Sequence, residues 1–443
     1  MNNKLFSRRG LLKGSAAAGA IMAAGSHHDL LGFAKAWAAD AKWKPEAGAS
    51  LQLTRWRRFV QSEDDAFRAI CASFKEATGC EVSVVEEGMD DVQPKASVAA
   101  NTGQGSDIFW GTYSMPQLFP KQALEITDVA EYLGGKYGGW VDAAKTYGTN
   151  DGRWICLPVT ISGNYINYRI SSVKAAGFDK VPEDTAGFLE CMKALKANGT
   201  PGGFALGRAT GDGNAWVHWA LWAHGGKLVD ENDKVAIDSA ETRAALEYVK
   251  ALYDTFAPGT VSWNDSFNNK AFLAGEVHLT NNGISIYVAG QNGDEKQKAI
   301  AEDMDHAYYP IGPVGKPTEF QVCFPVMGMN YTKFPNAVKA FFAYWMEADQ
   351  YNKWLTGSKG YMTHTLKAFD ANTVWDEDPK RKVFRDAATR TLTAGYPGSI
   401  GEKAASAIAD FIVLDMFANY ATGRASLDDA VKSAARSAGR IYR

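Results

Sequence analysis

Cysteine is scarce in this chain, which limits the ways in which the fold can be stabilised. The 443 residues include five cysteines, at positions 71, 80, 156, 191 and 323, and no two of them stand in C-x-x-C spacing. So few and so widely scattered cysteines exclude a disulfide framework, and the lack of C-x-x-C spacing excludes a cysteine-based zinc site. The odd number of cysteines leaves at least one free thiol. We expect small, buried apolar cysteines, with a bridge between Cys71 and Cys80 as an open alternative.

Runs of like charge are also missing. The chain carries 47 Lys and Arg against 50 Asp and Glu, a net charge of −3, and the two signs are interspersed along its length. Basic clusters are what bind nucleic acids and anionic membrane surfaces. We therefore expect neither partner.

Catalytic and metal-binding patterns are absent as well. His218 and His224 do not share a helix face and lie outside any H-E-x-x-H pattern. The S-x-x-K tetrapeptide at 171–174 has no partner motifs, segment 211–213 lacks the third glycine of a dinucleotide loop, and segment 312–317 lacks the spacing of a phosphate loop. We expect no enzyme activity, no metal and no cofactor.

An export signal opens the chain. Ser7 precedes the pair Arg8-Arg9, and an Ala/Gly-rich apolar run leads to an A-x-A exit at 36–38. This pattern predicts a twin-arginine signal peptide over residues 1–38, and its apolar run is shorter than the roughly 20 residues of a membrane span. Because no cysteine follows closely enough for lipid attachment, we expect a soluble periplasmic protein, exported folded by the Tat route.

Strand and helix signals alternate through the first two thirds of the chain, which predicts an α/β fold with mostly parallel sheets. The remaining residues exceed the size of a single core, so two lobes are expected. The C-terminal region is predicted to be mainly helical, from apolar stripes around 338–345 and 408–412. The elements predicted elsewhere are strands at 51–56, 82–85, 106–110 and 165–168, and helices at 62–78 (capped by Ser62), 185–197, 215–224 and 239–256 (capped by Asp238).

Aromatic residues are plentiful, with 13 Trp, 18 Tyr and 22 Phe, and many stand next to polar side chains. A sugar ring needs polar partners at its edge and an aromatic surface against its C–H face, so this interleaving predicts a carbohydrate site. Trp222, Trp345 and Trp354 lie in apolar helical stretches and are expected in the core. The candidate ligand-binding residues are Trp56, Glu63, Asp64, Trp110, Tyr113, Asn214, Trp216, His218, Trp263, Asn282 and Gly283.

Several short motifs follow one another in a distinctive order. They are Asp107-Ile108-Phe109-Trp110, Leu157-Pro158-Val159-Thr160 leading into Tyr165-Ile166-Asn167-Tyr168, Ala175-Ala176-Gly177-Phe178, Gly225-Gly226-Lys227-Leu228, and Ala271 to Val277 running into Asn281-Asn282-Gly283. In this order they resemble the extracellular solute-binding proteins of ATP-driven importers, in the carbohydrate branch that includes maltose-binding and glycerol-phosphate-binding proteins.

The resemblance implies two α/β lobes that enclose a ligand cleft and are joined by crossover hinge strands. It places residues 40–160 and 311–357 in the N-terminal lobe, and residues 161–310 and 358–443 in the C-terminal lobe. By position it also implies a ligand loop at 60–64, and cleft sites at Trp110 and Asn282-Gly283 and, opening a helix of the second lobe, at Asn214 and Trp216. We expect Trp110 and Trp216 to face the cleft from opposite lobes.

One departure bears on the ligand. Where maltodextrin-binding members place a Trp soon after the N-G pair, this chain has Ile284-Ser285-Ile286 and then Tyr287. A smaller sugar, a polyol or a phosphate derivative is therefore as good a candidate as an oligosaccharide. The implied function is capture of a carbohydrate-like solute by a monomer and its delivery to an ABC permease in the inner membrane. The alternatives are a Tat-exported enzyme and a chemoreceptor-coupled binding protein on the same fold.

Overall fold

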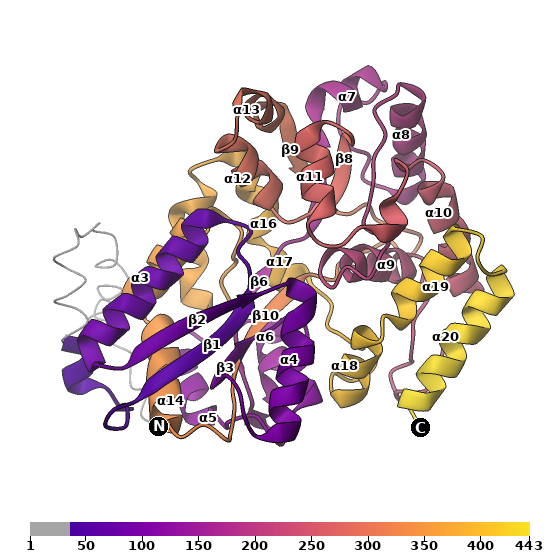
Figure 1. Ribbon diagram of the computed structural model, residues 1–443. Helices are drawn as coiled ribbons and strands as arrows, with labels where there is room; N and C mark the ends of the chain where they lie inside the picture. Colours follow the sequence, from indigo (N-terminus) through magenta and orange to yellow (C-terminus); the bar gives the residue numbers. More distant parts are fainter. Residues whose placement is uncertain (1–35) are drawn as a thin grey trace, which may run out of the picture.

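The computed structural model describes residues 36–443, and these form two α/β lobes that meet along a central boundary (Figure 1). The export signal predicted over residues 1–38 lies outside the described residues except for its last three. The two-lobe α/β architecture agrees with the prediction. Of the C-terminal helices, α19 (Ile412–Ala421) and α20 (Leu427–Ile441) lie against the second lobe on the side away from the N-terminal sheet, whereas α18 (Glu402–Ala409) lies beside the first lobe (Figure 1).

The N-terminal lobe is built on a five-stranded sheet with the order β2-β1-β3-β10-β6. Its strands are β1 (Ser50–Trp56), β2 (Glu81–Glu87), β3 (Ile108–Trp110), β6 (Leu157–Ser162) and β10 (Val322–Gly328). β1, β2 and β3 are parallel, whereas β10 runs antiparallel to both β3 and β6. The other elements of this lobe are α3 (Gln61–Thr78), α4 (Met89–Thr102), η1 (Met115–Leu118), α5 (Thr127–Lys136), α6 (Asp142–Gly148), β4 (Thr149–Asn150), β5 (Arg153–Trp154), α14 (Pro335–Trp345) and α15 (Ala348–Gly357).

The C-terminal lobe holds a three-stranded sheet with the order β8-β7-β9. β7 (Tyr165–Arg169) lies between β8 (Leu279–Asn282) and β9 (Met304–Ala307), and both neighbours are antiparallel to it. The prediction of mostly parallel sheets therefore holds only for β1 to β3. The main helices of this lobe are α7 (Ile170–Ala175), α8 (Thr185–Ala197), α9 (Asp212–Ala223), α10 (Ala240–Tyr253), α11 (Phe267–Ala274), α12 (Ser285–Gln291), α13 (Glu295–Glu302), α18 (Glu402–Ala409), α19 (Ile412–Ala421) and α20 (Leu427–Ile441).

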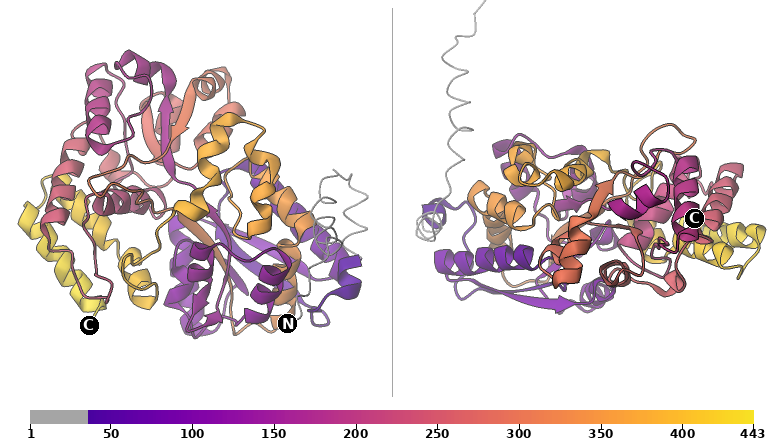
Figure 2. Two further views of the ribbon diagram at one scale, coloured as in Figure 1. Left: turned by 180° about the vertical axis from the view of Figure 1, so that it is seen from behind. Right: turned by 90° about the horizontal axis from the view of Figure 1, so that it is seen from above.

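The chain passes between the lobes through β6 into β7, through the segment between β9 and β10, and through the segment after α15, before the short helices α16 (Lys382–Arg385) and α17 (Ala387–Arg390). The first and third crossings are bonded to each other. Thr160 Oγ1 donates to Thr363 O at 2.7 Å, and Ser162 Oγ donates to Tyr361 O at 2.6 Å. The views from behind and above show one continuous body with the crossings at its centre (Figure 2). The lobes are thus joined by paired backbone segments instead of a loose tether.

Helix ends test the capping signals. α8 spans Thr185–Ala197 as predicted, and the Asp184 carboxylate accepts from Gly187 N at its start. The two caps predicted from the sequence, Ser62 and Asp238, are both wrong: α3 follows Val60 without a side-chain cap, and α10 is capped by Ser239, whose hydroxyl accepts from Thr242 N. In α10 the true cap directly follows the predicted one and is equally suited to the role, whereas α3 begins one residue before Ser62 with no capping side chain.

Two further features of the core bear on the predictions. All five cysteines are buried and unpaired, so the Cys71–Cys80 bridge does not form. Residues 402–421 are long and apolar enough to resemble a membrane span, but the structure breaks this stretch at Phe411, whose φ is 53°, and buries more than half of it. Its apolar residues therefore serve as a packing surface within the protein.

Candidate functional site

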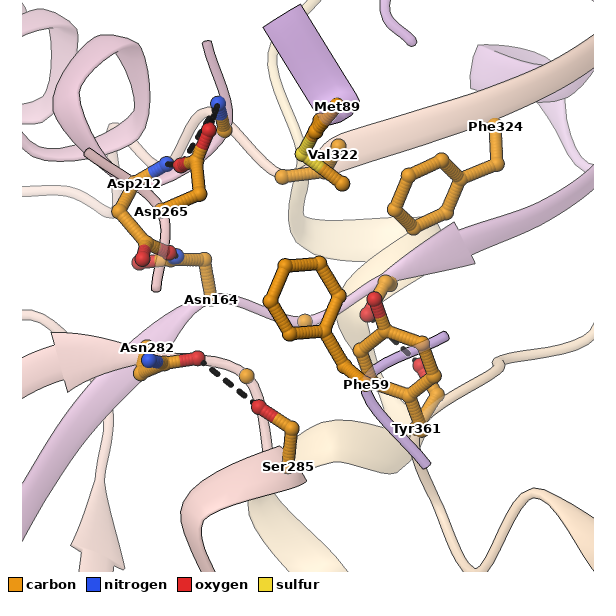
Figure 3. Close-up of a pocket in the computed structure, with 14 residues that line it drawn as sticks. Phe59, Met89, Asn164, Asp212, Asp265, Asn282, Ser285, Val322, Phe324 and Tyr361 are labelled. Atoms are coloured by element: carbon orange, nitrogen blue, oxygen red, sulfur yellow. Dashed lines mark hydrogen bonds between the residues drawn. The ribbon is translucent and has the colours of Figure 1, made fainter. Parts of the chain in front are cut away.

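A narrow pocket lies where the lobes meet, and we call it the floor pocket (Figure 3). Its lining comes from the loop after β1, the start of α4, the three chain crossings, the start of α9, and the turn between β8 and α12. Its volume is about 30 Å³, whereas binding sites for small molecules generally measure about 300 to 1,000 Å³. In this conformation the pocket is therefore too small to hold a sugar ring, and admitting one requires the lobes to move apart. The lining residues are Phe59, Met89, Ser162, Gly163, Asn164, Gly211, Asp212, Asp265, Asn282, Gly283, Ser285, Val322, Phe324 and Tyr361.

Two carboxylates stand side by side on the C-terminal side of this pocket. Asp265 Oδ1 accepts from the backbone amides of Gly211 at 3.0 Å and Asp212 at 2.6 Å. Asp212 in turn accepts from Asn164 Nδ2 at 2.6 Å and Asn268 Nδ2 at 2.8 Å. These bonds fix acceptor oxygens at the wall of the pocket, where they are suited to hydroxyl groups.

The surroundings of the two carboxylates favour their neutral forms. Burial, followed by the charge of Asp265, raises the pKa of Asp212 well above its ordinary value, and burial raises the pKa of Asp265 to about 6. The described lining of the floor pocket contains no Lys, Arg or His. An anionic solute would therefore meet acceptor oxygens with no cation beside them.

Aromatic and apolar groups form the opposite wall. Phe59, half-buried in the loop after β1, points into the pocket beside Tyr361 and Phe324 (Figure 3). The Phe324 ring is itself held by stacking on Trp56, with the centroids 4.2 Å apart and the planes at 21°. The pocket thus combines an aromatic wall with a wall of amide and carboxylate oxygens, which is the pairing that a polyhydroxylated ring requires.

A second pocket lies beside the first, and we call it the side pocket. It has a volume of about 360 Å³ and shares Met89 with the floor pocket. Two hydrogen bonds between the lobes lie at its wall. Tyr113 Oη donates to Gly211 O at 2.8 Å, and Thr210 Oγ1 donates to Asp90 Oδ1 at 2.8 Å. These bonds connect the lobes directly in this conformation.

The structure brings four of the predicted ligand-binding residues to these pockets. Asn282 and Gly283 line the floor pocket, and Tyr113 and Asn214 line the side pocket. Asn282 is the last residue of β8 and Gly283 follows it, and Asn282 Oδ1 accepts from Ser285 Oγ at the start of α12 at 3.2 Å. The motif therefore marks a strand end at the lobe boundary.

Trp110 and Trp216 do not face the cleft, which corrects the prediction made for them. Both are fully buried in the cores of their own lobes and line neither pocket. Trp110 lies in a strand that is buried at all of its three residues, and Trp216 lies in α9, whose 12 residues are all buried. Polar neighbours in sequence did not indicate exposure here, because these elements are covered by other elements on every side.

The other predicted residues also lie outside the pockets. Glu63 and Asp64 are buried against Arg55, and Glu63 Oε2 accepts from Arg55 Nη2 at 2.7 Å. Trp56 is buried in the same cluster, with its ring 5.1 Å from the Arg55 guanidinium. Trp263 is buried in the C-terminal lobe, but its backbone precedes Asp265 by two residues. Glu63 and Asp64 therefore act in packing the N-terminal lobe.

His218 is buried in α9, where its ring packs against Trp222 and Phe320 and its Nδ1 lies 2.8 Å from Asn214 O. Burial lowers the pKa of His218 to about 4. Since the unfolded side chain binds its proton near pH 6.5, this histidine contributes stability above pH 6.5 that is lost as the pH falls towards 4.

We expect a His218→Gln variant to lose part of this pH dependence. Between pH 6.5 and 4 the free energy of unfolding of the native protein should fall more steeply than that of the variant, by up to about 3 kcal/mol. Urea denaturation at a series of pH values measures the difference. Parallel curves for the two proteins would show that His218 is protonated in the folded state.

Several lining residues were missed by sequence reasoning. Phe59, Asn164 and Tyr361 lie in connecting segments without a motif, and Asp212 belongs to a glycine pair that indicated only a turn. Asp265 lies two residues after Trp263, which was predicted to bind the ligand, but Asp265 itself was not among the predicted residues. In the described part of the chain, no group of three or more His, Cys, Asp and Glu side chains is arranged to hold a metal ion.

Comparisons with known proteins agree with this architecture. The family described as bacterial extracellular solute-binding protein matches residues 69–383, whereas no curated protein matches the sequence. Among solved structures, maltose-bound MalE3 of T. maritima has a TM-score of 0.76 at 18% identity, covering 89% of this chain and 100% of that one. The GacH receptor of Streptomyces glaucescens, solved unliganded and with acarbose, has a TM-score of 0.75 at 18% identity and covers 90% and 99%. A solute-binding protein of Agrobacterium radiobacter K84 in complex with ribitol has a TM-score of 0.75 at 15% identity and covers 89% and 99%.

Proposed function

This chain belongs to the family of bacterial extracellular solute-binding proteins, and from this premise we propose that it captures an uncharged sugar or polyol for an ABC importer. The observation that carries the proposal is the composition of the floor pocket. In this pocket an aromatic wall around Phe59 lies opposite a wall of amide and carboxylate oxygens, and the described lining holds no cationic side chain. The sugar and polyol complexes of proteins with the same fold support this choice.

The pocket also argues against phosphate derivatives, which the sequence left open. Proteins bind phosphate with Arg, Lys or the N-terminus of a helix. At the start of α9, the backbone amides of Gly211 and Asp212 are already bonded to the Asp265 carboxylate. An incoming phosphate would have to displace this carboxylate and approach Asp212 as well.

Closure of the lobes provides the mechanism. The floor pocket is too small for a sugar ring in the conformation described here, so the solute enters when the lobes are further apart. Its contacts with both walls then shift the population towards closure around it. The bonds from Tyr113 to Gly211 and from Thr210 to Asp90 add to the closed form alone. A membrane permease that recognises the closed form then receives loaded protein.

The proposed setting is the periplasm. The family is extracellular, and the pair Arg8-Arg9 with the A-x-A exit at 36–38 supports export by the Tat route. Five unpaired, buried cysteines suit a protein that folds in the reducing cytoplasm before export. We propose that the exported protein acts as a monomer.

A thermal-shift screen tests the function. Neutral sugars and polyols are compared with their phosphates, and a ligand at 100 times its dissociation constant should add about 2.7 kcal/mol to the stability of the folded state. We expect stabilisation by a neutral compound and none by its phosphate. Stabilisation by the phosphate alone would overturn the proposed ligand class.

A Phe59→Ala variant then tests the site. Because Phe59 is half-buried and points into the pocket, its loss should weaken binding of the best ligand about tenfold or more while leaving most of the stability intact. Phe267→Ala is the matched control, because Phe267 is 46% exposed and lines neither pocket. Isothermal titration calorimetry measures both. Equal affinities in the two variants would remove Phe59 from the site.

A further inference from the structure

The A-x-A exit, where the export signal is predicted to end, lies against the folded N-terminal lobe. Residues 36–40 are helical, and within them Trp37 and Ala38 are half-buried, whereas Ala39 is exposed. We call residues 36–46 the exit segment. A cut after Ala38 would fall inside this segment, which packs on the protein, and not in a free tail.

Trp37 anchors the exit segment on the N-terminal side of the predicted cut. Its ring centroid lies 5.0 Å from that of Tyr344 in α14, edge to face at 73°, and 6.4 Å from that of Phe74 in α3. The Tyr344 ring is itself fixed, because its Oη is hydrogen-bonded to Ser73 Oγ and accepts from Gln350 Nε2 at 3.0 Å. Trp37 therefore packs on a rigid aromatic surface, and edge-to-face contacts stabilise the docked form.

A second set of contacts holds the exit segment on the C-terminal side of the predicted cut. Trp43 is buried, and its Nε1 donates to Asp128 Oδ2 at 2.8 Å. The Glu46 carboxylate accepts from the backbone amides of Asn336 at 2.8 Å and Ala337 at 3.0 Å, in the first turn of α14. The predicted cut therefore lies between two points that are both fixed to the same lobe.

The surface on which Trp37 docks exists only in the folded chain. Phe74 belongs to the first helix after β1, whereas Tyr344 belongs to a helix that follows the last strand of the sheet. Their rings come together, 5.5 Å apart between centroids, when the N-terminal lobe is complete. An export route that carries folded protein would therefore deliver the chain with its exit segment already docked.

Docking of this kind slows proteolysis. Proteins that bind a peptide by its backbone hold it extended, and exposed, poorly packed segments are the preferred sites of cleavage. A helical, docked exit segment meets neither condition, so only molecules in which it has detached can be cut. When detachment is fast, the rate of cleavage follows the population of the detached form. Each contact of Trp37 lowers that population and therefore lowers the rate.

We propose that Trp37 restrains the removal of the export signal by docking the exit segment on the folded N-terminal lobe. In the cleavage itself, water adds across the peptide bond between Ala38 and Ala39, leaving a carboxylate on the first and an amine on the second, and a signal peptidase supplies the catalytic groups. Trp37 leaves with the signal, whereas Trp43 and Glu46 stay and hold the new N-terminus. This inference rests on the export proposed above and on cleavage after Ala38.

Timed digestion of the full chain with a purified bacterial signal peptidase tests this inference. Trp37→Ala removes the docked ring, and Trp37→Phe keeps an aromatic ring at the same place. Lys44→Ala is the matched control, because Lys44 is exposed and lies in the same segment. A synthetic peptide of residues 8–47, with and without Trp37→Ala, measures recognition by the peptidase in the absence of the docking surface. Mass spectrometry identifies the bond that is cut.

We expect the full chain with Trp37→Ala to be cut about fivefold faster than the native chain, or more, because the detached form is more populated. The rate for Trp37→Phe should lie closer to the native rate than to that of Trp37→Ala, and the rate for Lys44→Ala should stay within about twofold of native. In the peptide, Trp37→Ala should change the rate by less than about twofold. Circular dichroism and melting curves confirm that each full-length variant is folded.

The contrary outcomes separate this inference from the export on which it rests. Equal rates for the native chain and Trp37→Ala, or the same acceleration in the chain and in the peptide, would overturn the docking restraint and leave the proposed export standing. A Trp37→Phe chain that is cut as fast as Trp37→Ala would overturn it too, since the restraint would then not come from aromatic contacts. A peptide that is not cut after Ala38 would defeat both the predicted cleavage site and this inference.

Discussion

Replacing Trp110 with alanine is expected to lower the free energy of unfolding by about 3 to 5 kcal/mol and to leave ligand affinity almost unchanged. The ring is fully buried and lies at 5.0 Å from Trp56, 4.8 Å from Trp345 and 5.9 Å from Trp354 between centroids. Its removal therefore opens a cavity at the centre of the N-terminal lobe. None of these four indoles lines the floor or side pocket.

Urea denaturation and calorimetry of the same preparations separate the two quantities. Phe267→Ala is the control, because this aromatic side chain is 46% exposed and should cost far less stability. A Trp110→Ala protein that keeps its stability but loses its ligand would restore Trp110 to the cleft and would contradict the buried position described above.

Glu63→Ala is expected to lower the free energy of unfolding by a similar amount, about 3 to 5 kcal/mol. Its carboxylate receives Arg55 Nη1 at 3.2 Å, Arg55 Nη2 at 2.7 Å and Trp354 Nε1 at 2.8 Å. Both charged side chains are completely buried. Without Glu63, the Arg55 guanidinium keeps only the carboxylate of Asp64, whose Oδ1 lies 4.0 Å away.

Glu81→Ala supplies the matched control for this charge. Glu81 pairs with Lys75 at 3.0 Å, but both side chains are more than half exposed, so this pair should contribute no more than about 1 kcal/mol. Denaturation midpoints and slopes in urea compare the variants. Similar, small losses from both would mean that water reaches Arg55 and replaces the lost carboxylate.

The fold was predictable because its signals are local and repeated. α8 carries an Asp cap and an apolar stripe, and its observed bounds match the prediction. The core positions of Trp222, Trp345 and Trp354 were confirmed as well, since each lies on an apolar helical stretch. Sheet pairing was less predictable: β10 joins the first sheet and lies antiparallel between two early strands, which no local pattern indicates.

The site was harder to predict, because a residue lines a pocket through the position of its element and not through its sequence neighbours. Trp110 and Phe59 show the difference. Trp110 is the last residue of a recognisable motif but lies in a fully buried strand. Phe59 belongs to no motif but lies in a loop at the lobe boundary. Among the predicted residues, Asn282 and Gly283 are the ones that line the floor pocket: they combine a motif with a position at the end of β8, at that boundary.

The central position of β10 also determines the order in which this protein can fold during synthesis. β3 and β6 are made early, but the strand that pairs with both of them begins at Val322. Until the ribosome has released that strand, the N-terminal lobe presents two unpaired strand edges, which are prone to pairing with other chains. Domains usually fold in the order in which they are synthesised, but here the first lobe depends on residues made after the second sheet is complete. The edges of β3 and β6 that pair with β10 therefore stay open while the residues between β6 and β10 are being synthesised.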